Sequence, residues 1–131
     1  MPKIESLLMR HRAEKKVLRV QLDEGESLMK AIPQAMREHG IKEARVEEIK
    51  GTVKEIMINF FEGPRFDSKK LKDQTILRAH GVVKQSFGEL FGSIHVSLSK
   101  KPPLTGTLVN AIAGKDAEIV MSFIELKEIQ Q

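Results

Sequence analysis

Short stretches in which apolar and polar residues alternate recur along this chain, and their period of two constrains the fold more than any other feature. In residues 16–22, KVLRVQL, the alternation gathers Leu18, Val20 and Leu22 on one side. Because successive side chains of a β-strand point to opposite faces of a sheet, this pattern predicts a strand with one buried face. Similar patterns, rich in β-branched residues, predict further strands at residues 44–53, 54–61, 74–83, 90–99, 106–114 and 117–129.

One segment, residues 23–40, has the period of a helix instead. Its apolar residues at helical spacing are Leu28, Ile32, Ala35 and Met36. Ser27, or Asp23 together with Glu26, can cap the start of this helix. Pro33 lacks a backbone N–H and its ring clashes with the preceding turn, so it predicts a kink or a short helix that begins late.

The remaining segments contain residues that interrupt regular structure. Residues 62–73, EGPRFDSKKLKD, contain Gly, Pro, Ser and four basic residues, and are expected to form an exposed loop. Residues 100–104, KKPPL, are expected to form a second loop, because two prolines exclude a central strand. Gly51 predicts a bulge or bend. One helix among seven strands predicts an α+β domain, built as a mostly antiparallel sandwich or barrel-like sheet.

Composition excludes several classes of function. The 131 residues are most simply one domain, and without cysteine the chain has neither disulfides nor thiolate metal ligands. No apolar run reaches the roughly 20 residues that span a bilayer, and no export signal is recognised, so a cytoplasmic protein without a membrane partner is expected. The sequence also lacks a phosphate-binding glycine loop, a Gly-x-Ser-x-Gly elbow and a His-Glu-x-x-His zinc motif. No catalytic residue is therefore predicted.

Several motifs follow one another in an order that resembles the PPC domain, named for plants and prokaryotes conserved. They are VLRVQLDEGESLMKAIPQAMREHGI, ILRAHGVV, IHVSLS, TGTLV and AEIVM. The resemblance extends from Met9 to Leu126, and we divide the chain into a basic N-terminal segment, residues 1–15, and a PPC-like domain, residues 16–128. It implies a compact antiparallel β domain with one main helix that forms a homotrimer. Bacterial and archaeal members are candidate DNA-binding proteins, and the fold is shared with acetolactate decarboxylase, a metal enzyme.

The resemblance also implies a place where a metal could bind. The family's His-Leu-His motif here reads Ser93-Ile94-His95, and a third family histidine is replaced by Thr107. Three imidazoles would suit a divalent metal, whereas a hydroxyl keeps its proton at neutral pH and is a poor ligand. Only His95 remains of the three, so no metal and no other cofactor is predicted.

A second histidine can lie beside the first. If the strands 74–83 and 90–99 form a hairpin in which Gln85 faces Leu90, His80 falls directly opposite His95. Opposed residues have Cβ atoms about 4.5–5.5 Å apart, close enough to share a metal or an anion. Glu118 matches a glutamate common in the family and could orient a ligand there. The alternative is that both histidines lie on a polar sheet face, or at a trimer seam, and bind nothing in particular.

Basic residues are the candidates for contact with DNA, and the net charge of the chain is +4. The residues assigned to this role are Arg10, Arg12, Lys69, Lys70, Lys100 and Lys101. Lysines in loops also maintain solubility without binding anything. The plant AT-hook core, Arg-Gly-Arg-Pro, is absent, so reading of the minor groove is not expected.

Two functions therefore remain open from the sequence. The first is a non-enzymatic, trimeric PPC-domain protein that binds DNA weakly and with low specificity. The second is a small-molecule or metal-binding protein of the acetolactate decarboxylase-like fold with a degraded metal site.

Overall fold

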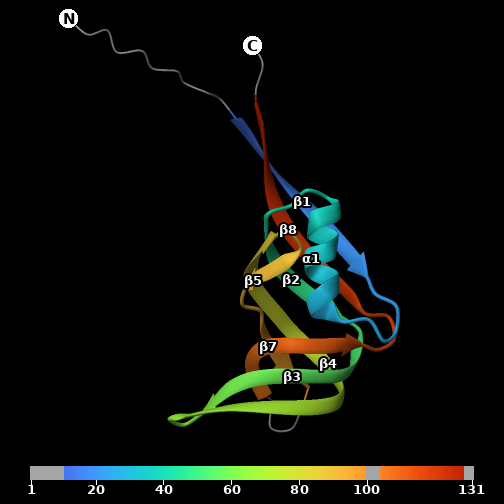
Figure 1. Cartoon of the computed structure of the whole chain (residues 1–131), viewed down its shortest axis with the longest axis vertical. Coiled ribbons are helices and arrows are strands. Elements are labelled where there is room, and N and C mark those ends of the chain that lie inside the picture. Colours follow the sequence, from blue (N-terminus) through green and yellow to red (C-terminus); the bar gives the residue numbers. More distant parts are fainter. Residues whose placement is uncertain (1–10, 100–103, 129–131) are drawn as a thin grey trace, which may run out of the picture.

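The computed structural model describes residues 11–99 and 104–128, which form one helix and antiparallel strands (Figure 1). The elements are β1 His11–Gln21, α1 Leu28–Glu38, β2 Glu43–Lys50, β3 Thr52–Glu62, β4 Arg65–Ser86, β5 Glu89–Gly92, β6 His95–Leu98, β7 Leu104–Ala113 and β8 Glu118–Glu128. The predicted fold class, a mostly antiparallel α+β domain with one main helix, is confirmed. Within the described residues, no helix is long and apolar enough to cross a membrane.

The long strand β4 takes part in two sheet regions. Its last part lies in an open sheet of order β1, β8, β2, β4, with β5 paired to β4 at the edge. Its other parts pair with β3 and with β6, and β7 joins β3 to β6, so that β4, β3, β7 and β6 form a closed ring of pairings. In Figure 1 the open sheet and α1 fill the upper part of the molecule, and the ring fills the lower part.

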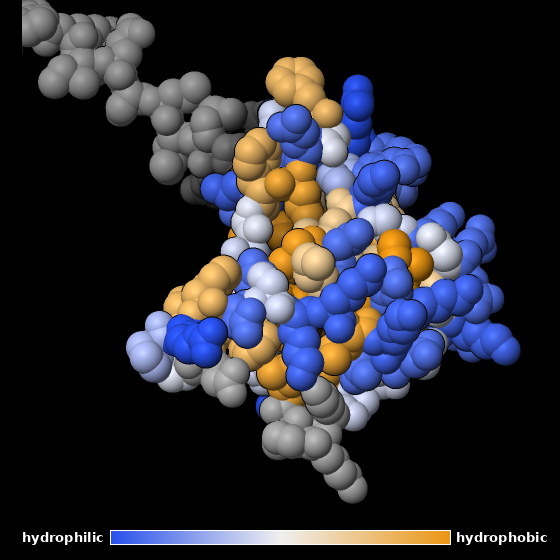
Figure 2. Space-filling view, turned by 60° about the horizontal axis from the view of Figure 1, so that its bottom comes forward, coloured by the Kyte–Doolittle hydropathy of each residue, from blue (hydrophilic) through white to orange (hydrophobic). Residues whose placement is uncertain are grey.

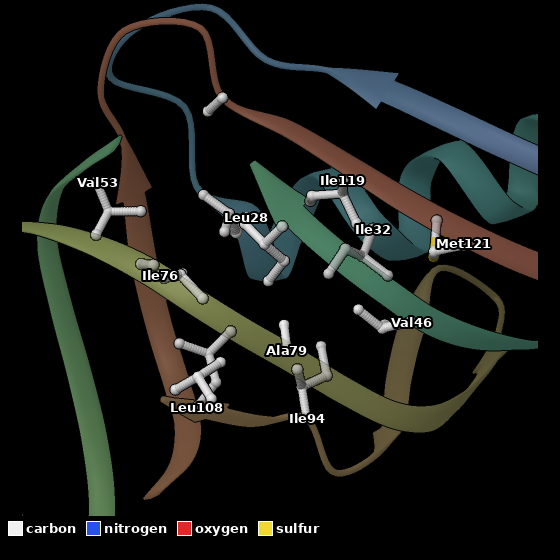
Figure 3. Close-up of a cluster of buried hydrophobic side chains, with 14 of the residues drawn as sticks. Leu28, Ile32, Val46, Val53, Ile76, Ala79, Ile94, Leu108, Ile119 and Met121 are labelled. Carbon is white, nitrogen blue, oxygen red and sulfur yellow. The ribbon is translucent and has the colours of Figure 1, made fainter. Parts of the chain in front are cut away.

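The core lies between α1, the inner face of the open sheet and the inside of the ring. Leu28, Ile32 and Met36 are completely buried on one side of α1. Figure 3 shows Ile32 close to Val46 of β2 and Ile119 of β8. A helix with an apolar stripe buries that stripe against the sheet. This requirement explains why Leu28, Ile32 and Met36 lie on the side of α1 that faces the core.

The start of the helix differs in detail from the expectation. The helix is shorter than residues 23–40 and continues through Pro33, which is buried inside it. Ser27 occupies the N-cap position but makes no capping hydrogen bond. Its Oγ instead donates to Oδ1 of Asn110 on β7, at 2.9 Å, so the hydroxyl connects the helix to the ring.

The prediction of an exposed loop at residues 62–73 is wrong, because most of this segment is strand. β3 and β4 form a hairpin with a two-residue turn, Gly63–Pro64, and their register runs from Glu62 opposite Arg65 to Thr52 opposite Thr75. Gly63 has a φ of +62°, which two-residue hairpin turns require. The Gly-Pro pair interrupts the strands for only two residues. The polar stretch that follows the turn is a strand because it forms a ladder of hydrogen bonds with β3. The hairpin projects from the lower end of the molecule (Figure 1).

β1 begins at His11, five residues earlier than the strand expected at 16–22, and pairs with β8 along its whole length. Lys16 lies 2.8 Å from Glu125 across this pair. The hydrogen bond to Glu125, followed by the charge of that carboxylate, raises the pKa of Lys16. Because the pKa of Lys16 is raised in the folded state, the ion pair stabilises the folded protein at neutral pH. This stabilisation is lost only as the pH rises through the folded pKa of the lysine.

Candidate functional site

The two histidines that the sequence predicts to face each other do so. Gln85 pairs with Leu90, and with the same register His80 of β4 pairs with His95 of β6. The imidazole centroids lie 5.4 Å apart, and both side chains are exposed. Oγ1 of Thr107 on β7 lies 3.4 Å from Nδ1 of His95.

The histidine pair belongs to a row of polar residues that crosses the ring. The register places His80, His95, Thr107, Asn59 and Ser68 opposite one another in that order, on β4, β6, β7, β3 and again β4. At the far end of the row the hydroxyl of Ser68 donates to Oδ1 of Asn59 at 2.5 Å. The row is rich in hydroxyl and imidazole groups and contains no carboxylate.

A shorter row lies beside the first. Arg78 pairs with Ser97, and Ser97 pairs with Thr105, with the two hydroxyl oxygens 3.1 Å apart. A guanidinium, imidazoles and hydroxyls can all donate hydrogen bonds, so the chemistry of this surface suits an anion better than a divalent cation.

The remaining candidate ligand, Glu118, has a different partner. It lies on β8 between Gln21 of β1 and Lys50 of β2, and its carboxylate accepts a hydrogen bond from Arg19 at 2.9 Å. No pairing brings Glu118 to the histidine pair. Among the described residues there is no group of three or more histidines and carboxylates placed to hold a metal ion.

The residues assigned to DNA are only partly described. Arg10, Lys100 and Lys101 lie outside the described residues. Arg12 lies on β1, where it forms an ion pair with Glu14 at 2.5 Å.

Lys69 and Lys70 both lie on the β3–β4 hairpin, but on opposite faces of it. Lys69 pairs with Ile58, whereas Lys70 pairs with Met57 and lies 3.6 Å from Glu55. Because side chains alternate along a strand, Lys70 shares its face with Lys72, and Lys69 points the other way. The two lysines therefore cannot act as one flat basic patch.

The hairpin also carries two exposed aromatic residues to which the sequence analysis assigned no site. Phe61 and Phe66 face each other across the strands, next to the turn, with ring centroids 5.4 Å apart and an angle of 65° between the planes. They are 75% and 60% exposed. At the left of Figure 2 a projecting part of the molecule shows apolar surface beside strongly hydrophilic surface. The signal in the sequence was Gly63–Pro64, because a two-residue turn there places Phe61 directly opposite Phe66.

The comparisons with known proteins agree with this fold. The model of the Plants and Prokaryotes Conserved (PCC) domain matches residues 9–125. A PPC protein from Pyrococcus horikoshii is 25% identical, with a TM-score of 0.65, 95% of this chain covered and 85% of that one. A metal-containing protein from Archaeoglobus fulgidus is 24% identical, with a TM-score of 0.69 and coverage of 94% and 87%. A candidate DNA-binding protein from Bacteroides thetaiotaomicron is 19% identical, with a TM-score of 0.67 and coverage of 86% and 82%.

None of the curated proteins matches the chain significantly. The domain match nevertheless spans nearly all of the sequence, and the overall fold agrees with that of the Archaeoglobus fulgidus structure. The chain belongs to the Plants and Prokaryotes Conserved domain family.

Proposed function

We propose that this protein is a non-enzymatic PPC-domain protein that acts as a homotrimer and binds DNA weakly, through the phosphate backbone and with little sequence preference. The observation that carries the proposal is the β3–β4 hairpin, which carries several cations, projects from the body and is therefore accessible to a large ligand (Figure 1). Its cations occupy both faces, so they can contact phosphates on either side of the hairpin. They are Arg65, Lys69, Lys70 and Lys72.

The rest of the fold supports a low sequence preference. α1 buries its apolar stripe in the core, and a helix held in this way is a poor reader of the major groove. Contacts to phosphates position a protein on DNA but carry no sequence information. The DNA-binding description of the Bacteroides thetaiotaomicron neighbour agrees with this function, although at 19% identity the likeness speaks for the fold alone.

The proposal is tested by fluorescence anisotropy on two unrelated duplexes at several salt concentrations. If about four phosphates are contacted, log affinity should fall with log salt with a slope of about −3 to −4. The double variant K69A/K70A should reduce the magnitude of that slope by about 2, because each lost phosphate contact changes it by about 0.9. The control K30A/K42A removes the same charge away from the hairpin and should leave the slope unchanged.

Two outcomes would contradict this function. A strong preference for one duplex that survives at about 200 mM salt would mean that a sequence-reading element exists. No binding even at about 20 mM salt would exclude an electrostatic DNA-binding protein.

The homotrimer is supported by the outer face of the open sheet, which is the face away from α1. Antiparallel sheets that face water on one side carry polar residues there. On this sheet the outward positions alternate with core residues such as Leu18 and Met121, yet many of them are apolar and exposed. They are Val17, Val82, Phe91, Ile124 and Leu126. An exposed apolar surface of this kind is typical of a protein–protein interface.

A second copy of the chain suits this face better than DNA does. Its charges have both signs, with Lys15 and Arg45 near Glu43 and Glu47, so it does not attract a polyanion. A groove of about 920 Å³ opens here, between residues 39–47 and Ser122–Leu126, and could accept side chains of a neighbouring subunit. Neither His80 nor His95 lines this groove.

The second candidate function is binding of a small anion or a metal at His80 and His95. The observation that favours it is the direct pairing of the two imidazoles, with the Thr107 hydroxyl beside His95. It is the weaker candidate because both side chains are exposed and Glu118 is engaged by Arg19.

A further inference from the structure

We propose that the tip of the β3–β4 hairpin binds nucleic-acid bases, with Phe61 and Phe66 stacking on an unpaired or unstacked base while Lys70 and Lys72 hold the adjoining phosphates. This inference rests on the proposed DNA-binding function and adds a contact to bases that basic residues alone would not make. It concerns one face of the hairpin, which is defined by the alternation of side chains along β3 and β4.

The aromatic pair is poorly explained by the fold of the chain itself. Large aromatic side chains are normally buried, because each can remove 150–250 Å² from water. Phe60, on the other face of β3, does pack against the core, whereas Phe61 and Phe66 remain mostly exposed at the end of a projecting hairpin. Their edge-to-face contact holds the two rings in a defined geometry and leaves ring surface accessible.

The residues behind the pair supply the polar part of the site. Phe66, Ser68, Lys70 and Lys72 follow one another at every second position of β4 and therefore share a face. Ser68 is hydrogen-bonded to Asn59 of β3, so an uncharged polar pair separates the rings from the lysines. From Phe66 to Lys70 the strand rises by about 13 Å, which places the first ammonium one or two nucleotides from the rings.

The charges of this face favour nucleic acid over an apolar protein surface. From the turn back to Lys70, its residues are Phe61, Phe66, Asn59, Ser68 and Met57, none of which is acidic. Glu55, beside Lys70, is the first carboxylate along this face. A base offers an apolar π-surface flanked by phosphates, and sites for single-stranded nucleic acid combine aromatic platforms with basic residues in this way.

The experiment compares the intact protein with the double variant F61A/F66A. The probes are a fluorescein-labelled single-stranded 20-mer and the duplex of the same sequence, each titrated at several salt concentrations. The variant should lose affinity by roughly 5- to 150-fold, the range expected when one base–aromatic stack is removed. Its salt slope should stay unchanged because no phosphate contact is lost, whereas K70A should reduce the magnitude of the slope by about 0.9 on the duplex and by about 0.7 on the single strand. F87A removes a ring outside the hairpin that is even more exposed, and this variant should bind like the wild type.

The two probes distinguish the source of the base. A loss confined to the single strand assigns the tip to unpaired bases, and a loss on both probes assigns it to bases that the protein unstacks in a duplex. Wild-type binding that F61A/F66A leaves unchanged overturns this inference but not the proposed function, whereas absence of wild-type binding at about 20 mM salt overturns both. If F61A/F66A instead converts an oligomer into a monomer with unchanged DNA affinity per chain, the rings belong to a subunit interface and the inference is wrong.

Discussion

At the scale of single residues, the surroundings of the histidine pair decide which ligands it can bind. His80 and His95 face each other, but the two positions at which the family resemblance implies further histidines carry hydroxyl groups, Ser93 between β5 and β6 and Thr107 on β7. Two imidazoles leave zinc short of the three or four protein ligands it usually has. The surface therefore keeps hydrogen-bond donors suited to anions without the ligand set of a metal centre.

We predict that the protein purifies without stoichiometric zinc, even when no chelator is used. The variant T107H adds an imidazole directly opposite His95 and should bind zinc with measurable affinity, detected by elemental analysis and by a zinc-dependent rise in Tm. H80A in the T107H background is the control and should weaken that binding. Stoichiometric zinc in the wild type, lost in H80A, would show instead that His80 or a neighbouring subunit completes a native site.

At the scale of elements, the connections are as constrained as the strands. Gly51 joins β2 to β3 with a φ of +88°, a conformation that other residues rarely adopt. A Cβ built there would lie 2.4 Å from the carbonyl oxygen of Asp116, on the turn before β8. The bend expected at Gly51 is present, and it requires glycine for two reasons: the positive φ and the close contact with the turn that contains Asp116.

Gly51→Ala should lower the free energy of unfolding by more than the cost of backbone strain alone, which is about 1–3 kcal/mol, because the methyl group also meets backbone atoms that cannot move freely. Urea unfolding measures the change. Gly25→Ala is the matched control, since Gly25 has a φ of +95° but no atom within 4 Å of the added Cβ. Equal losses for the two variants would show that the contact with Asp116 relaxes without cost.

At the scale of the whole molecule, the open sheet has one face covered by α1 and an opposite face that nothing in the described chain covers. That face extends over β1, β8, β2, β4 and β5, and its exposed apolar residues come from four of these strands, β1, β4, β5 and β8. A homotrimer would remove this surface from water through a closed symmetric arrangement, which is how most soluble assemblies satisfy such faces.

Light scattering should give about three times the monomer mass of 14.8 kDa at micromolar concentration. I124D places a charge on the outer face of the open sheet and should shift the protein toward smaller species, because an unpaired charge in an interface is costly to desolvate. F87D alters an exposed phenylalanine in the turn between β4 and β5 and should leave the assembly intact. A wild-type mass of one chain over the whole concentration range would contradict the homotrimer.

Much of the fold was already determined by the sequence, because period-two and helical patterns are local properties. Strand alternation located most of the strands, and Leu28, Ile32 and Met36 identified the buried side of α1. Even the contact between His80 and His95 was predictable. The short turn after Ser86 fixes the register of its hairpin, and each step along one strand then fixes the opposite residue.

Only the tertiary structure decided which distant segments pair. Residues 65–73 look like a loop because they are polar and follow Gly63–Pro64, yet they form a strand because β3 offers a complete ladder of hydrogen bonds. The same hairpin brings Phe61 to Phe66 and places Lys69 and Lys70 on opposite faces. The pairing of β8 with β1, which joins distant parts of the chain, directs Glu118 to Arg19. The physical reason is that a local pattern states which face of a segment seeks burial, whereas its partner depends on hydrogen bonding and packing across the whole chain.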